Sequence, residues 1–119
     1  MDEIMQGKLR ALGIDTQDAL TRFMGNDTLL MKFLLNFPQD PNFQNLKRAM
    51  EDQNMEAAYQ AVHALKGVAG NLSMTELFRQ SCAITEDLRN KDFSSAMDKM
   101  DALEAQYLRI VSALEKLNN

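Results

Sequence analysis

His63 is the only histidine in this 119-residue chain, and the residues after it bear on what it could do. An imidazole can act as a nucleophile, as a general acid or base, or as a metal ligand. Lys66 follows three positions later, where its cation would suit an anion bound at the ring. Gly67 and Gly70 follow at four and seven positions, a spacing that places both on the His63 face of a helix.

A helix predicted over residues 55–71 would turn that face toward solvent. At about 100° per residue, its apolar positions fall in an arc of roughly 120°, and His63 lies about 140° from the centre of that arc. The apolar positions are Ala58, Ala61, Val62, Leu65, Val68, Ala69 and Leu72. An exposed histidine alone is usually an ordinary surface residue, so only its neighbours can indicate a function.

The two glycines near His63 weaken the helix without an evident structural benefit. Each glycine inside a helix lowers stability by about 1 kcal/mol relative to alanine. Core packing does not explain glycines that face outward, although Gly70 lies near the predicted helix end, where glycine is commoner. Glycines on this face would have a purpose if another molecule must approach the imidazole closely. We therefore predict a docking face around His63.

Capping residues and helix breakers divide the rest of the chain. Gly13 and Gly25 can take the left-handed conformation that ends a helix, and Pro38 stops another. The predicted N-terminal signals are Asp15, Asn26 or Asp27, Asp40-Pro41, Asn54, a capping box at Ser73-x-x-Glu76, and Asp92. The expected helices span about 2–11, 16–24, 27–37, 41–52, 55–71, from the Ser73 cap through Leu88, and 93–117.

These helices favour an all-α fold, an antiparallel four-helix bundle with a short N-terminal helical extension, in which residues 1–119 form a single domain. No window alternates apolar and polar residues over six positions, so strands are not expected. In the last helix the apolar spacing is three and four: Phe93, Ala96, Met100, Leu103, Tyr107, Ile110, Leu114 and Leu117. Such an apolar stripe could also form a dimeric coiled coil. We expect a monomer, in which this stripe is needed to close the core.

The composition argues against several classes of protein. Thirteen Lys and Arg against seventeen Asp and Glu give a net charge of −4, and no basic cluster occurs, so no nucleic-acid partner is expected. No stretch approaches the roughly 20 apolar residues of a membrane span, so no membrane association is expected. The single Cys82 excludes an internal disulfide and a cysteine-based zinc site. Without signal-peptide features, the chain is predicted to be cytoplasmic.

The segment His63-Ala-Leu-Lys-Gly-Val-Ala-Gly-Asn-Leu72 resembles the H-x-L-K-G-x-[AS]-x-x-[LI] signature of histidine-containing phosphotransfer (HPt) domains of two-component phosphorelays. The resemblance covers most of the chain: segments 12–15 and 19–26 are similar to the family's N-terminal part, and 33–37, Leu77 and Cys82-x-x-x-Glu86 also fit. Ser73 departs from the family pattern, in which Gly often follows the Leu. A capping-box role for Ser73 would make this substitution benign.

The resemblance implies roles for particular residues. His63 would be the phosphoacceptor, and Lys66 would stabilise the charge of the transferring phosphoryl group. The partner-docking residues would be Gly67, Gly70, Tyr59 and Thr85. In the family the next helix often offers a polar side chain to the histidine, and the matching position is Thr85, with Arg89 one turn further. A neutral imidazole, with a pKa of about 6.5, can attack a phosphoryl group at cytoplasmic pH.

The resemblance also implies what the partner must supply. The chain has no G-x-x-x-x-G-K-[ST] loop and no acidic cluster for Mg²⁺ beside His63. The aspartate and the Mg²⁺ would therefore belong to a response-regulator receiver domain, and a hybrid sensor kinase would be a further partner. We expect no metal or cofactor in this chain, which would be a phosphoryl carrier and not an enzyme.

The sequence excludes two other functions and leaves two alternatives open. A di-metal bundle needs Glu-x-x-His motifs, whereas Gln60 stands three positions before the one histidine. A catalytic triad needs a nucleophile, and the chain has no nucleophile motif such as G-x-S-x-G. A helical adaptor whose His63 is never phosphorylated stays open. So does an HPt-like segment excised from a larger hybrid or chemotaxis kinase.

Overall fold

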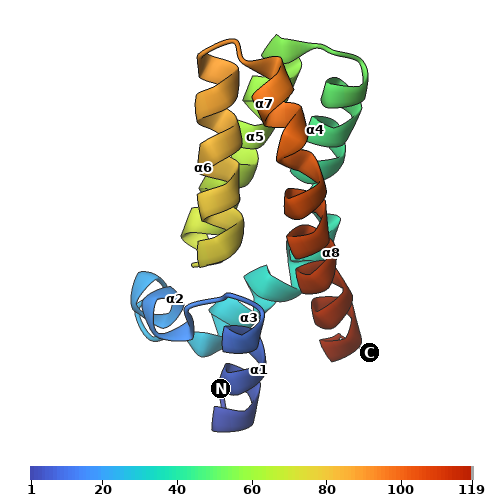
Figure 1. The fold of residues 1–119 in the computed structure, drawn as a ribbon. Helices are drawn as coiled ribbons and strands as arrows, with labels where there is room; N and C mark the ends of the chain where they lie inside the picture. The colour runs from blue at the N-terminus through green and yellow to red at the C-terminus, as the bar shows by residue number, and fades with distance from the viewer. Residues whose placement is uncertain (119) are drawn as a thin grey trace.

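The structure, a computed structural model, describes residues 1–118 as helices joined by short turns (Figure 1). The α-helices are α1 (Glu3–Ala11), α2 (Thr16–Arg22), α3 (Asp27–Asn36), α4 (Asn42–Glu51), α5 (Met55–Asn71), α6 (Thr75–Arg89), α7 (Phe93–Asp98) and α8 (Met100–Leu117). A short 3₁₀ helix, η1 (Phe37–Gln39), separates α3 from α4. The prediction of an all-α helical bundle is confirmed.

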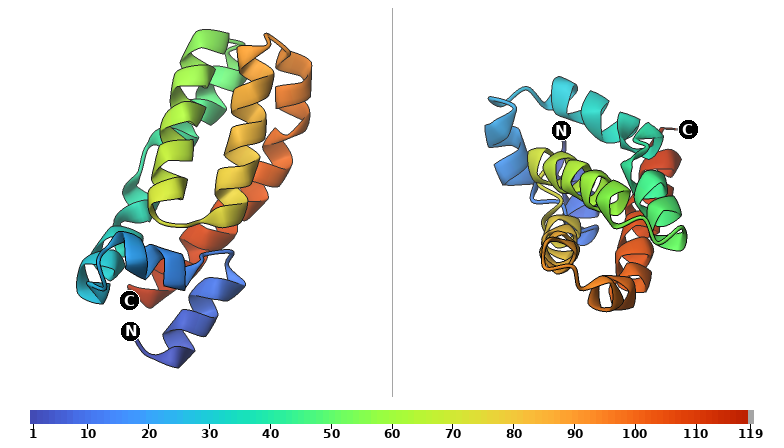
Figure 2. Two further views of the ribbon diagram at one scale, coloured as in Figure 1. Left: turned by 90° about the vertical axis from the view of Figure 1, so that its left-hand side faces the viewer. Right: turned by 90° about the horizontal axis from the view of Figure 1, so that it is seen from above.

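The bundle is formed by α4, α5, α6 and the consecutive pair α7–α8, which lie side by side (Figures 1 and 2). Followed along the chain, these four units alternate in direction. Helix α5 packs most extensively against α6 and α4. The N-terminal helices α1, α2 and α3 lie at the end of the bundle where α5 turns into α6. The N-terminal extension is thus three helices that cover one end.

Most of the predicted helix ends are present. Side chains at four N-caps accept a backbone N–H three residues on, at 3.0 to 3.1 Å: Asp15, Asn26, Asn54 and Asp92. Gly13 and Gly25 have φ of +83° and +78°, the left-handed conformation that favours glycine. Pro38 lies in η1, directly after α3 ends. Local capping chemistry therefore sets these boundaries.

Three predictions about helix boundaries are wrong. The N-cap residue of α4 is Pro41 and not Asp40, and it has no side-chain capping bond. Ser73 is not an N-cap: its φ is +54°, its hydroxyl is bonded to Asp18 of α2, and Met74 precedes α6 without a side-chain cap. The last helix is not continuous, because it is interrupted at Lys99. There the backbone N–H of Lys99 bonds Ala96 O, three residues back, which tightens one turn. The apolar stripe continues across the break, since Ala96, Met100 and Leu103 are all buried.

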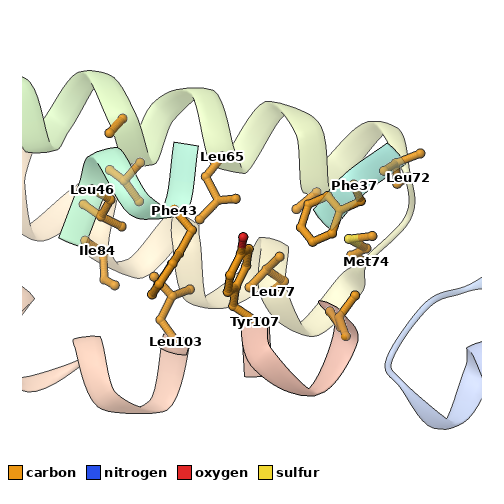
Figure 3. Packing of buried hydrophobic residues seen from close by; sticks show 14 of the residues in the cluster. Phe37, Phe43, Leu46, Leu65, Leu72, Met74, Leu77, Ile84, Leu103 and Tyr107 are labelled. Carbon is orange, nitrogen blue, oxygen red and sulfur yellow. The ribbon is translucent and has the colours of Figure 1, made fainter. Parts of the chain in front are cut away.

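The core joins α5 to its neighbours and fixes its rotation. Phe43 of α4 stacks on Tyr107 of α8 with ring centroids 4.2 Å apart, and Phe37 meets the edge of the same ring at 5.8 Å (Figure 3). Leu65 of α5 points into this cluster and is fully buried. A helix held on one face by such packing presents its opposite face to solvent.

Candidate functional site

Helix α5 exposes His63 on the face opposite its core residues. Helical periodicity assigned seven apolar positions to the core. Six of them are buried, and Val68 is half-buried. Because Ala58, Leu65 and Ala69 are fully buried, the helix has no freedom to turn the imidazole inward. The prediction that His63 faces solvent is confirmed.

Gly67 leaves open space one turn after His63. It is exposed, and a Cβ built on it would meet no atom within 4 Å outside its own helix backbone. Lys66 is half-buried beside this face. Among residues 1–118, no carboxylate lies within 4.0 Å of its ammonium, so Lys66 carries a positive charge that no ion pair neutralises. The imidazole thus has free access and an uncommitted cation nearby.

Gly70 does not share the open face, and the prediction that it does is wrong. It is half-buried, and a Cβ there would lie 3.2 and 3.3 Å from two ring atoms of Phe78 on α6. The absence of a side chain lets the Phe78 ring pack close to the α5 backbone. Helix packing therefore accounts for Gly70, whereas no contact accounts for Gly67.

Tyr59 lies beside His63, whereas Thr85 is buried inside the bundle. Tyr59 is half-buried and stacks on His63, with ring centroids 6.0 Å apart and planes at 7°. Thr85 is 2% exposed, and its hydroxyl donates to Ser81 O at 2.7 Å. Since that bond occupies the hydroxyl inside the bundle, Thr85 does not belong to the exposed face, which corrects its assignment as a docking residue.

Arg89 is exposed at the C-terminal end of α6. Its guanidinium bonds Glu86 at 2.6 Å. The pKa of Arg89 is raised above its usual value, first by the hydroxyl of Tyr59 and then by the negative charge of Glu86.

An apolar groove of about 730 Å³ lies next to the C-terminal turns of α5. Its apolar wall combines residues of α5 with residues at and after α2 and along α3: Phe23, Phe33, Phe37, Val68 and Leu72. Phe23 and Phe33 pack at 5.4 Å, and Phe33 is 50% exposed. The sequence analysis predicted a helix over residues 27–37 but not the groove, because only the burial of Leu30 and Leu34 shows which face of α3 points inward.

Comparison with known protein families assigns the chain to one family. The family model of the Hpt domain matches residues 29–115, which include α5 and His63. The chain belongs to the Hpt domain family. Hpt domains are phosphoryl carriers with a histidine phosphotransfer role in phosphorelays, and they interact with receiver domains of response regulators. No curated protein and no solved structure matches the chain.

Two further observations concern the part of this Hpt domain that the structure describes. No helix within residues 1–118 is long and apolar enough to cross a membrane. Within the same residues, no three His, Cys, Asp or Glu side chains gather in a group that could hold a metal ion.

Proposed function

We propose that this Hpt domain accepts a phosphoryl group on His63 from the aspartyl phosphate of one receiver domain and passes it to the aspartate of another. The observation that carries the proposal is the exposure of His63 beside the open space at Gly67. A receiver domain can bring its phosphorylated aspartate to the imidazole only where no side chain blocks the approach.

The chemical step needs little from this chain beyond a positioned nucleophile. The lone pair of the unprotonated ring nitrogen attacks phosphorus, a P–N bond forms, and the P–O bond to the aspartyl carboxylate breaks with that carboxylate leaving. The onward step reverses these changes on a second receiver. Phosphoryl transfer depends mostly on alignment and on stabilising the charge of the equatorial oxygens. The positive charge of the Lys66 ammonium would provide part of that stabilisation.

The docking face would combine His63 and Gly67 with the apolar groove beside them. An exposed apolar patch of this kind marks a surface that another molecule covers. Phe33→Ala should raise the receiver concentration at half-maximal transfer rate and leave the maximal rate unchanged. Transfer measured against receiver concentration tests this, and an unchanged half-maximal concentration would remove the groove from the docking face.

The decisive test of the function is His63→Gln. Because His63 is exposed, the variant should keep the helical content and melting temperature of the wild-type protein. It should take up no acid-labile phosphate from a phosphorylated receiver. Uptake that survives in the variant, or a wild-type protein that takes up none from any of a panel of receivers, would refute the carrier function and favour an adaptor.

A further inference from the structure

Tyr59 lies against the imidazole of His63 on the same face of α5. The two residues are four positions apart, which places their side chains one above the other on a helix. The ring centroids are 6.0 Å apart and the planes differ by 7°, so the rings are parallel. Tyr59 is half-buried whereas His63 is exposed, and the tyrosine ring lies beside one face of the imidazole.

Stacking is the contact that could orient this imidazole. Among the described residues 1–118, no hydrogen bond from this chain reaches either ring nitrogen of His63. The hydroxyl of Thr85, on the neighbouring helix, is occupied by Ser81 O at 2.7 Å. Without a hydrogen bond, an exposed histidine on a helix samples two of its three χ1 wells and two ring orientations about χ2, or about four arrangements.

We propose that Tyr59 is a positioning residue, which holds the His63 imidazole in one orientation so that its nucleophilic nitrogen points toward the incoming phosphoryl group. This inference rests on the proposed phosphotransfer function. It gives Tyr59 a role in the rate of the chemical step, distinct from the docking role expected from the sequence. Only one of about four arrangements would align the lone pair, so loss of the stack should lower the rate about fourfold.

Two substitutions separate the aromatic ring from apolar bulk. Tyr59→Phe keeps the parallel ring and loses the hydroxyl, and Tyr59→Leu keeps the apolar bulk and loses the ring. In the Leu variant the maximal rate of transfer from a phosphorylated receiver should fall about fourfold, with the half-maximal receiver concentration unchanged. The Phe variant should stay within about twofold of wild type.

A second measurement needs no phosphate at all. Three-bond NMR couplings of unphosphorylated protein report the χ1 rotamer of His63. They should indicate one rotamer in the wild-type and Phe proteins and averaging in the Leu protein. Phosphorylation by phosphoramidate, a small donor that needs no docking, should show the same order of rates. Circular dichroism melts of both variants provide the control for folding.

The outcomes distinguish this proposal from the function on which it rests. A Leu variant with unaveraged couplings, or one that raises only the half-maximal receiver concentration, would overturn the positioning role and leave Tyr59 as a docking contact. A Phe variant as slow as the Leu variant would overturn the stack as the cause. A wild-type protein that takes up no phosphate from either donor would overturn the phosphotransfer function itself.

Discussion

Ser73 donates a hydrogen bond of 2.6 Å from its hydroxyl to Oδ2 of Asp18, which joins the turn between α5 and α6 to α2. The carbonyl of Ser73 also accepts the backbone N–H of Asp15 at 2.8 Å. Two bonds therefore attach the N-terminal helices to the end of α5. The groove beside the docking face is lined by residues of α5 and by residues at and after α2, so these bonds connect two of its walls.

The left-handed backbone at Ser73 predicts an unusual order of stability among its variants. Both Ser73→Ala and Ser73→Gly lose the bond to Asp18, but only glycine is free of the strain at φ +54°. The Gly variant should therefore be more stable than the Ala variant by about 1 kcal/mol. Urea unfolding measures both.

Ser94 provides the matched control for this comparison. It is exposed within α7, where helix propensity makes alanine better than glycine by about 1 kcal/mol, so the order of the two variants should be reversed. If alanine were more stable than glycine at both positions, the backbone conformation of Ser73 would have no influence on stability.

Asp18 should make stability depend on acid pH. The pKa of its carboxyl is lowered, first by the hydroxyl of Ser73 and then by Arg22. A lowered pKa in the folded state contributes stability that is complete above the unfolded value of about 3.9. This contribution is lost as the pH falls through the folded-state pKa.

The stability difference between wild type and Asp18→Asn should therefore shrink as the pH is lowered from about 5 to about 2. Thermal melts across this range measure it. Asp98 is exposed and forms no ion pair among the described residues, so Asp98→Asn serves as the control variant. A constant difference for Asp18→Asn would contradict the assignment.

Alanine substitutions should distinguish the two glycines of α5. Gly67→Ala should stabilise the domain by about 0.5–1 kcal/mol, since its Cβ enters open space. Gly70→Ala should stabilise it less or not at all, because the Phe78 ring at 3.2 Å must move. Denaturant unfolding gives both values, and a Gly70 variant as stable as the Gly67 variant would show that Phe78 yields without cost.

Larger side chains at Gly67 should block transfer without unfolding the protein. Gly67→Leu and Gly67→Glu should keep the wild-type melting behaviour, yet place atoms where the aspartyl phosphate must approach. A misplacement of about 1 Å can lower the rate about 100-fold. Gly7 on α1 is also in open space and serves as control, so Gly7→Leu should transfer normally. Normal transfer by Gly67→Leu would place the docking path elsewhere.

Lys66→Ala should slow phosphotransfer by about 10- to 100-fold, the effect of removing one charge-assisted contact of about 1–3 kcal/mol. Its stability should change little, since Lys66 forms no ion pair among the described residues. Rapid-quench transfer from a phosphorylated receiver measures the rate, with Lys8→Ala on an exposed part of α1 as control. Equal rates in the two variants would mean that Lys66 is an ordinary surface lysine.

The sequence was sufficient for those features that depend on local chemistry. Side-chain caps at Asp15, Asn54 and Asp92 are short-range hydrogen bonds, so residue type and position predict them. The outward direction of His63 followed from helical periodicity, because one apolar stripe must face the core. The open space at Gly67 followed in the same way.

Only the tertiary structure decided which distant residues meet. Ser73 looked like an N-cap because its spacing to Glu76 fits, but the hydroxyl binds Asp18, 55 positions away, and no local pattern encodes that pairing. Gly70 and Thr85 lie where helix α6 packs against α5, and the rotation of α6 determines that Phe78 covers the glycine while Thr85 turns inward. Interhelical packing is settled by the combined burial of many side chains, and it therefore cannot be obtained from the periodicity of one helix.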